Sequence, residues 1–286
     1  MNCSDESKNE SSCIKDLIKK YRFTRWIRNC YWFSRFKLEN FTFNFFRLLR
    51  VCRIYDPDYS QLAQLKNMYS GKRCFIIATG PSLRSEDILA LRNEYTFTMN
   101  AMCLKYEELK WTPTFYVIQD VAVFQKLKDN IHNPNIKYIF VDGRHKKHCI
   151  KHSNWRFFPR LSSYNSYDAY FRNIYKAKFS NDIHSVVYDG FTVTCSAIQI
   201  AAYMGFKEIY LLGCDCGYSE DKSKRYFVDH GVVAKHLDTS TERMFEGYSV
   251  AKKYADSNEI KIFNATRGGK LEIFPRVDFD KIQLIK

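Results

Sequence analysis

The chain has 286 residues, of which 45% are hydrophobic and 27% charged, so it is long enough for one large α/β domain with an appendage or for two small domains. Its formal net charge of +14 predicts an acidic partner: nucleic acid, an anionic membrane or a phosphorylated substrate. The ten cysteines are scattered and match no common zinc-binding spacing, so we expect mostly reduced thiols in a cytosolic compartment.

Two stretches bear on a membrane location. The first residues, 1–7, are polar and acidic, which is not typical of a signal peptide. The longest run without charges, Gly190–Phe206, contains Thr192, Thr194 and Gln199. That run therefore predicts a buried helix and not a membrane span.

The N-terminal segment 14–58 differs sharply from the rest of the chain because basic and aromatic residues are interleaved along it. We predict a disordered tail over residues 1–13 and a helical arm over 14–58. Cations attract anionic lipids and aromatic rings bury at the headgroup level, so residues 14–55 are expected to bind an anionic membrane surface. Two alternatives stay open: the aromatics pack on the main domain, or the arm binds single-stranded nucleic acid.

From residue 60 onward, strand-like and helix-like stretches alternate. The predicted strands are Cys74–Ala78, Tyr95–Asn100, Pro113–Asp120, Lys137–Asp142, Lys207–Gly213 and Glu259–Phe263. The predicted helices are Leu62–Tyr69, Glu86–Arg92, Val121–Asn130, Thr194–Met204 and Glu246–Ala255. Near-continuous apolar strands alternating with helices predict an α/β fold, with a Rossmann-like, mostly parallel sheet covered by helices on both faces. We assign residues 59–286 to this domain, with 143–190 (irregular, basic and aromatic) and 217–245 as insertions or a lid.

The turn Thr79–Ser82 follows the first predicted strand and precedes a predicted helix that Ser85 can cap. A strand, a glycine turn and a helix N-terminus together predict an anion site. Ligands of parallel sheets bind outside the carboxyl ends of the strands, where Asn100 and Asp120 also fall. The sequence therefore predicts a ligand site at this edge of the sheet.

Three ordered motifs carry a resemblance to a known group. They are Ile77–Leu83 (IATGPSL), Ala201–Asp215 (AAYMGFKEIYLLGCD) and Phe263–Asp278 (FNATRGGKLEIFPRVD). They resemble the DUF115 group, which is related to flagellin-glycosylating Maf proteins and to archaeal hydroxymethylpterin pyrophosphokinases. The first two motifs also resemble the bacterial lipooligosaccharide sialyltransferases of glycosyltransferase family 42. The likeness spans roughly residues 70–280.

The resemblance implies a GT-A-variant, Rossmann-like domain that binds a CMP-linked sialic acid or related nonulosonate. The residues it implies for the nucleotide are Thr79, Gly80, Pro81, Ser82, Asn100, Gln119, Asp120, Thr194 and Asp215. The sialyltransferases carry Asn at the positions of Thr79 and Asp120, so these two contacts depart from the family pattern.

For catalysis, the resemblance implies a histidine general base on a loop and tyrosine hydroxyls near the leaving phosphate. The reaction itself also requires a general base, because the attacking hydroxyl must lose its proton. Histidine suits this role because it titrates near working pH. His236 and His230 are the candidates for the base, and Tyr226 is the candidate for the phosphate. The family's Gly-His-Ser context is absent at both histidines.

Two arginines and two acidic strings complete the candidates. Arg267 and Arg276 flank a Gly-Gly turn and are expected either to neutralise a phosphate or sugar carboxylate or to pin the C-terminal segment. The strings 56–58 and 278–280 both read Asp-x-Asp, which metal-dependent glycosyltransferases share. We interpret both as turns and expect no metal site and no required cofactor, as in the sialyltransferases.

These observations predict an inverting glycosyltransferase that moves a nonulosonate from CMP to a glycan acceptor, in lipopolysaccharide, O-antigen or capsule synthesis. The acceptor is expected to be lipid-linked, and the protein to lie in the cytoplasm, attached peripherally to the inner face of the bacterial plasma membrane. No nucleic-acid partner is expected, and a homo-oligomer is an open option. The alternatives are an ATP-dependent pterin pyrophosphokinase or a glycosyltransferase that uses another nucleotide sugar.

Overall fold

The computed structural model describes residues 22–56, 59–148, 152–217, 221, 225–229, 231–232 and 239–285. At its centre, the described strands form a seven-stranded sheet in which each neighbouring pair is parallel. The strands are β1 (Arg73–Ile77), β2 (Thr96–Met99), β3 (Phe115–Ile118), β4 (Tyr138–Asp142), β5 (Trp155–Phe158), β8 (Glu208–Leu212) and β9 (Lys261–Asn264). A second sheet pairs β6 (Arg160–Leu161) with β7 (Val187–Tyr188). The predicted Rossmann-like, parallel α/β fold is confirmed.

The strand order is β5-β4-β3-β2-β1-β8-β9. The chain therefore runs outward from β1 to β5, returns to the middle and continues in the opposite direction through β8 and β9. Connections that leave β1 and β8 diverge to opposite sides, and this reversal opens a crevice beyond their carboxyl ends. The reversal sets the place of the candidate site.

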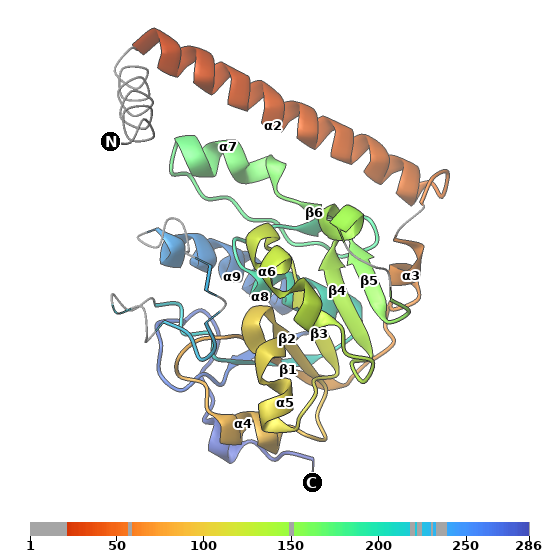
Figure 1. Cartoon of the computed structure of the whole chain (residues 1–286), viewed down its shortest axis with the longest axis vertical. Helices are drawn as coiled ribbons and strands as arrows, with labels where there is room; N and C mark the ends of the chain where they lie inside the picture. Colours follow the sequence, from red (N-terminus) through yellow and green to blue (C-terminus); the bar gives the residue numbers. More distant parts are fainter. Residues whose placement is uncertain are drawn as a thin grey trace, which may run out of the picture.

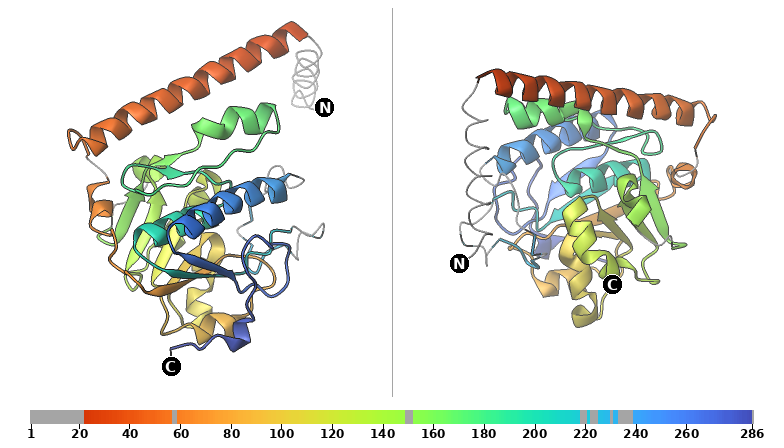
Figure 2. Two further views of the ribbon diagram at one scale, coloured as in Figure 1. Left: turned by 180° about the vertical axis from the view of Figure 1, so that it is seen from behind. Right: turned by 45° about the horizontal axis from the view of Figure 1, so that its top comes forward.

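Alternation along the strands divides the interior into two hydrophobic cores. On β1, Cys74 and Ile76 face one core, and Phe75 and Ile77 face the other. This two-sided burial explains why the strands are continuously apolar. The helices α8 (Val193–Tyr203) and α9 (Ser240–Ser257) cover the first face. The helices α4 (Ser85–Ala90), α5 (Tyr106–Leu109) and α6 (Val121–Ile131), with the 3₁₀ helix η1 (Asn100–Lys105), cover the second (Figures 1 and 2).

The structure corrects several predicted boundaries. The predicted helix Leu62–Tyr69 is a short helix, α3 (Ser60–Ala63), followed by turns. Ser85 does not cap α4, because Arg84 occupies the extended N-cap position and no side chain bonds there. The stretch 143–190, predicted to be irregular, holds the 3₁₀ helix η2 (Gly143–His148), the edge strand β5, the small sheet and α7 (Ser163–Phe171).

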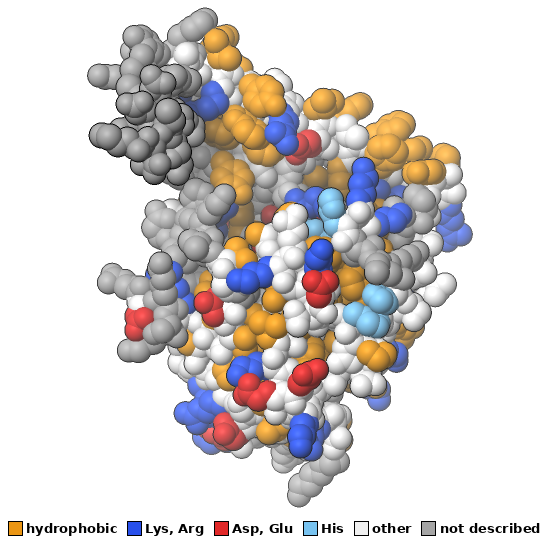
Figure 3. Space-filling view, viewed as in Figure 1, with side chains coloured by type: hydrophobic (Ala, Val, Ile, Leu, Met, Phe, Trp, Pro, Cys, Tyr) orange, Lys and Arg blue, Asp and Glu red, His pale blue; other side chains and the backbone are white. Residues whose placement is uncertain are grey.

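The basic aromatic arm forms a long helix, α2 (Arg22–Val51), which lies along one end of the molecule above α7 (Figure 1). Its ring contacts to the domain join Phe33 to Tyr167, with centroids 5.0 Å apart, and Trp32 to Phe171, 6.5 Å apart. Large hydrophobic side chains remain exposed along it: Trp26, Ile27, Tyr31, Phe33, Leu38, Phe41, Phe45, Phe46, Leu48 and Val51. Figure 3 shows hydrophobic and basic side chains mixed on this face. The predicted tail 1–13 and residues 14–21 lie outside the described residues.

Candidate functional site

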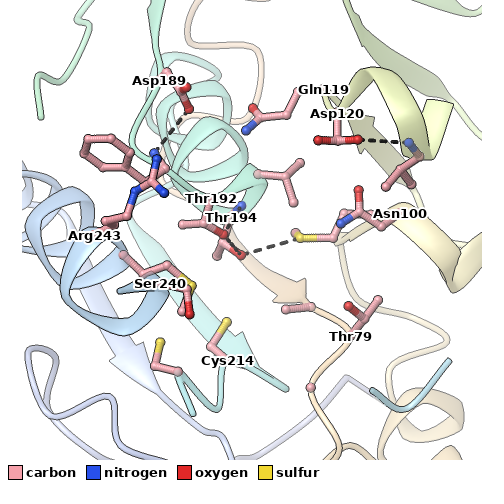
Figure 4. Close-up of a pocket in the computed structure, with 18 of the residues that line it drawn as sticks. Thr79, Asn100, Gln119, Asp120, Asp189, Thr192, Thr194, Cys214, Ser240 and Arg243 are labelled. Carbon is pink, nitrogen blue, oxygen red and sulfur yellow. Dashed lines mark hydrogen bonds between the residues drawn. The ribbon is translucent and has the colours of Figure 1, made fainter. Parts of the chain in front are cut away.

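A pocket of about 900 Å³ opens at the carboxyl ends of β1, β2, β3 and β8. It therefore lies at the reversal of strand order, as expected for a doubly wound sheet. Of the residues predicted to bind the nucleotide, Thr79, Gly80, Pro81, Asn100, Gln119, Asp120, Thr194 and Asp215 line it. Figure 4 shows several of them turned toward a common space.

The turn after β1 packs directly on the turn after β8. The Gly80 N–H donates to the Gly213 carbonyl at 2.9 Å, and a Cβ on Gly80 would overlap that carbonyl and the Asp215 carboxylate. Only glycine permits this approach. Ser82 does not line the pocket; its hydroxyl donates to Asp215 Oδ2 at 2.9 Å and so orients that side chain. Burial raises the pKa of Asp215, and the hydrogen bonds from Ser82 offset part of this rise.

The ends of β2 and β3 supply amides and a carboxylate. Asn100 has a positive φ of 49°, and its buried Oδ1 has no hydrogen-bond partner in the described part of the chain. Gln119 Oε1 accepts a hydrogen bond from Ser196 at 2.6 Å, which fixes the Gln119 side chain in the pocket wall. Asp120 caps α6 by accepting from the Val123 N–H at 2.9 Å. A buried acceptor without a described partner makes Asn100 the clearest candidate for a ligand contact among these three residues.

In the described part of the chain, four α-helices begin at the pocket. Residues at the N-cap or in the first turn of α6, α7, α8 and α9 line it, represented by Val121, Ser162, Thr192 and Ser240. Helix N-termini present unpaired N–H groups and a positive dipole end, so their convergence favours an anionic ligand.

The helix that the sequence predicted for this anion site is a different one. α4 follows the Thr79–Ser82 turn in the chain, yet none of its residues belongs to the pocket wall. Leu83 is buried in the core beneath the second face of the sheet, and this burial directs α4 away from the crevice. The helix N-termini that line the pocket therefore belong to other helices.

Among the described residues, four arginines line the pocket: Arg144, Arg160, Arg225 and Arg243. Arg160 is bound between two carboxylates, with Nε donating to Asp142 Oδ2 at 2.6 Å and Nη1 pairing with Asp189 Oδ2 at 2.8 Å. Burial alone would lower the pKa of Arg160, but the Asp189 and Asp142 carboxylates hold it above its ordinary value. Arg144 also pairs with Asp142, at 2.7 Å. These pairs rigidify the wall.

Sequence reasoning missed these arginines because it placed them in loops. Arg144 and Arg160 fall in the stretch predicted to be irregular, and Arg243 precedes the predicted start of its helix at Glu246. A signal for the true start was present: Thr239 followed three residues later by Glu242 is a capping-box pattern. Thr239 indeed occupies the N-cap position of α9, although its side chain makes no capping bond.

The family model for 6-hydroxymethylpterin diphosphokinase MptE-like proteins matches residues 53–221. The chain belongs to the MptE-like family. This match spans β1 to β8 and includes both turns of the crevice.

Two further comparisons place the MptE-like chain among known proteins. A comparison with curated protein sequences finds no match. Among solved structures, a Maf glycosyltransferase from Magnetospirillum magneticum AMB-1 is similar, at 18% identity and a TM-score of 0.48. The alignment covers 78% of this chain and 38% of that one, so the MptE-like chain spans less than half of that relative's length.

The candidates for catalysis are only partly visible in the MptE-like structure. His230 and His236 lie outside the described residues. Tyr226 lines the pocket, and its neighbour Phe227 donates its N–H to the Thr79 carbonyl at 2.9 Å. This bond ties the Tyr226 segment to the turn after β1, which is distant from it along the chain.

The two C-terminal arginines are placed away from the pocket wall. Arg267 forms ion pairs with Asp87, at 2.9 Å, and with Asp280. Arg276 pairs with Glu272 and donates to the Gly268 carbonyl at 2.7 Å. Both therefore pin the C-terminal segment, which was one of the two roles expected for them.

The two Asp-x-Asp strings also have structural partners. Asp56 accepts from the Tyr59 N–H at 2.9 Å, and Asp278 accepts from the Asp280 N–H at 3.1 Å. Pro57 and Asp58 lie outside the described residues. Within the described ranges, no group of three or more His, Cys, Asp or Glu side chains is placed to hold a metal ion.

Over the same ranges, no helix combines the length and apolar character needed to cross a membrane.

Proposed function

We propose that this MptE-like protein is an inverting glycosyltransferase that moves a sialic acid, or a related nonulosonate, from a CMP donor to a glycan acceptor in bacterial surface polysaccharide synthesis. The observation that carries the proposal is the crevice between β1 and β8. There the Gly80 turn, the N-termini of α6, α7, α8 and α9, and the Asn100 amide oxygen, which has no partner among the described residues, surround one pocket. The two motifs that resemble family 42 sialyltransferases contain the turns after β1 and β8, and both turns line the pocket.

The proposed reaction uses groups of this pocket. The acceptor hydroxyl attacks the anomeric carbon, the new carbon–oxygen bond forms, and the bond to the CMP phosphate oxygen breaks with its electron pair leaving on CMP. The first turns of α6 and α8 and the Tyr226 hydroxyl are suited to stabilise the charge on the departing phosphate. The acceptor proton goes to a general base, for which His236 and His230 remain the candidates.

The family description favours a second candidate, pyrophosphoryl transfer from ATP to a hydroxymethylpterin. This reaction requires magnesium and carboxylates that hold it. The acids lining the pocket, Asp120, Asp189 and Asp215, are already partners of the α6 N-terminus, Arg160 and Ser82 respectively. Magnesium binding would have to compete with these bonds, so we place this candidate second.

Thermal unfolding of the full chain distinguishes the candidates. CMP at 100 times its dissociation constant stabilises the native state by about 2.7 kcal/mol. At about 2–4 °C per kcal/mol, the unfolding midpoint is expected to rise by about 5–10 °C, with or without EDTA. A rise only with ATP and magnesium would replace the proposal by the second candidate, and a rise only with UDP or GDP would change the donor. With CMP-N-acetylneuraminate and a lipid-linked acceptor, release of CMP should then be measurable.

A lipid-linked acceptor fits the relation between the pocket and α2. The helix α7 has two faces: Ser162, Ser166 and Tyr170 line the pocket, while Tyr167 and Phe171 pack on rings of α2. The helix α7 therefore lies between α2 and the pocket. We propose that the exposed aromatic and basic side chains of α2 bind an anionic membrane surface and bring the pocket to lipid-linked acceptors, at the inner face of the plasma membrane.

Vesicle binding tests the role of α2. Replacing the exposed Arg25 and Arg28 by Gln is expected to weaken binding to vesicles that contain phosphatidylglycerol by about 30-fold, since each basic residue near such a surface contributes about 1 kcal/mol. Replacing the exposed Lys66 and Lys110 by Gln removes the same charge from the domain and should change binding by less than about threefold. Equal losses in the two pairs would show a general charge effect and contradict a docking role for α2.

A further inference from the structure

Arg243 differs from the other arginines whose contacts are described in the pocket wall. Arg144 and Arg160 are neutralised by carboxylates, whereas Arg243 has no ion pair in the described part of the chain, and its Nε is buried without a hydrogen-bond partner. Its guanidinium carbon instead lies 5.2 Å from the ring centroid of Phe191 and 5.6 Å from those of Tyr170 and Tyr175. Rings hold the cation by its faces and leave its N–H groups available to an oxyanion.

Three separate parts of the chain build this aromatic cage. Tyr170 lies in α7, and Tyr175 lies in the segment that follows α7. Phe191 directly precedes the N-cap residue of α8. Phe191 has a φ of 65°, a left-handed conformation that is unfavourable for a bulky residue, and its N–H donates to Asp189 Oδ1 at 3.2 Å. Backbone strain at a pocket is typical of a position where a side chain must be held for function. Here the strained residue places a ring against Arg243.

The cage lies beside the first turn of α8, apart from the turn after β1. Figure 4 shows Arg243 on the side of Asp189 and Thr192, with Thr79 and Asn100 on the opposite side. The ion pair described for the Asp189 carboxylate is with Arg160, and the described residues contain no ion pair between Asp189 and Arg243. The pocket therefore offers two places to anions, one at the Thr79–Pro81 turn and one at Arg243 and the α8 N-terminus.

A CMP-nonulosonate carries two such anions, because its phosphate and its carboxylate are substituents of the same anomeric carbon. We propose that Arg243 binds the carboxylate of the transferred sugar and so selects carboxylated donors. A guanidinium and a carboxylate match in planar, two-bond geometry, and the rings keep water from the guanidinium faces. This inference rests on the proposed donor class and adds the residue that recognises it.

The test removes the charge from both partners in turn. Affinities for CMP, for an inert CMP-3-fluoro-N-acetylneuraminate and for the methyl ester of its carboxylate are measured by calorimetry. Wild-type protein is expected to bind the acid about 10–100-fold more tightly than the ester, as befits a charged hydrogen-bonded pair. In Arg243→Gln this ratio should fall below about threefold, while affinity for CMP stays within about twofold of wild type.

The control and the second variant keep the outcome interpretable. Arg156 also lies over a ring, 4.7 Å from the centroid of Tyr138, but does not line the pocket, so Arg156→Gln should retain the wild-type ratio. Arg243→Lys keeps the charge without the planar geometry and should give an intermediate ratio, which also covers the case of a poorly folded Gln variant. An unchanged acid-to-ester ratio in both Arg243 variants, or a parallel loss of CMP affinity, overturns the carboxylate assignment alone. A wild-type protein that binds neither CMP nor the CMP-sugar overturns the proposed function and this inference together.

Discussion

Replacement of Gly80 by alanine is expected to force the turns after β1 and β8 apart and to weaken nucleotide binding by at least about tenfold. The added Cβ would overlap the Gly213 carbonyl and the Asp215 carboxylate, and the carbonyl belongs to backbone that cannot rotate away. Overpacking of this kind costs about 1–3 kcal/mol of folding free energy. Calorimetric titration with CMP and thermal unfolding of the same variant measure both effects.

Gly217 offers a matched control within the same pocket. The atoms nearest to a Cβ on Gly217 would belong to the Lys270 side chain, at an ordinary contact distance of 3.5 Å. Gly217→Ala should therefore change the free energy of unfolding by less than about 0.5 kcal/mol and leave CMP affinity nearly unchanged. If Gly80→Ala changes stability and CMP affinity as little as this control, the inference that the two turns approach too closely for a Cβ is wrong.

The second large effect is expected at Asp142, which is fully buried and bonds to both Arg144 and Arg160. Asp142→Ala leaves the Arg160 guanidinium, whose side chain is 9% exposed, with Asp189 as its described carboxylate partner. Removing one member of a buried ion pair costs about 3–5 kcal/mol, and here the Arg160 charge keeps only the part of its compensation that Asp189 provides. At about 2–4 °C per kcal/mol, thermal unfolding should show a midpoint lower by about 6–20 °C.

A surface pair and a double variant test the cause. Asp256 pairs with Lys252 on the exposed side of α9, so Asp256→Ala should cost less than about 1 kcal/mol. Adding Arg160→Met to Asp142→Ala removes the partly compensated buried charge. It also removes the partner of Asp189, but that side chain is 17% exposed and can be solvated, so the double variant should recover part of the lost stability. The explanation by buried charge is wrong if the double variant unfolds at a lower temperature than Asp142→Ala.

The core strands could be predicted closely because their signal is local. Each of the six predicted strands overlaps an observed one, since runs such as Cys74–Ala78 are apolar on both faces and bounded by polar residues. The edge strand β5 was missed because its sequence, Trp155–Phe158, contains an arginine and lies in a basic stretch. Its pairing with β4 depends on a neighbour in space, which a local pattern does not contain.

The candidate site could be predicted only in part, for the same reason. Thr79, Asn100 and Asp120 follow strands, so their presence at one edge follows from a parallel sheet alone. The contact of Gly80 with Asp215, and that of Ser82 with a carboxylate 133 residues away, follow from the placement of β8 beside β1. Arg243 acquires its ring contacts only when α7, α8 and α9 meet.

The sequence by itself determined the class of fold, the edge of the sheet at which the pocket lies and the basic aromatic character of the arm, because these depend on residue type and short-range order. Only the tertiary structure decided which helix ends surround the pocket, which arginines are neutralised and which one, Arg243, has no described carboxylate partner. It also decided that α7 lies between α2 and the pocket. Such facts depend on strand order and long-range packing, which bring together residues that are distant along the chain.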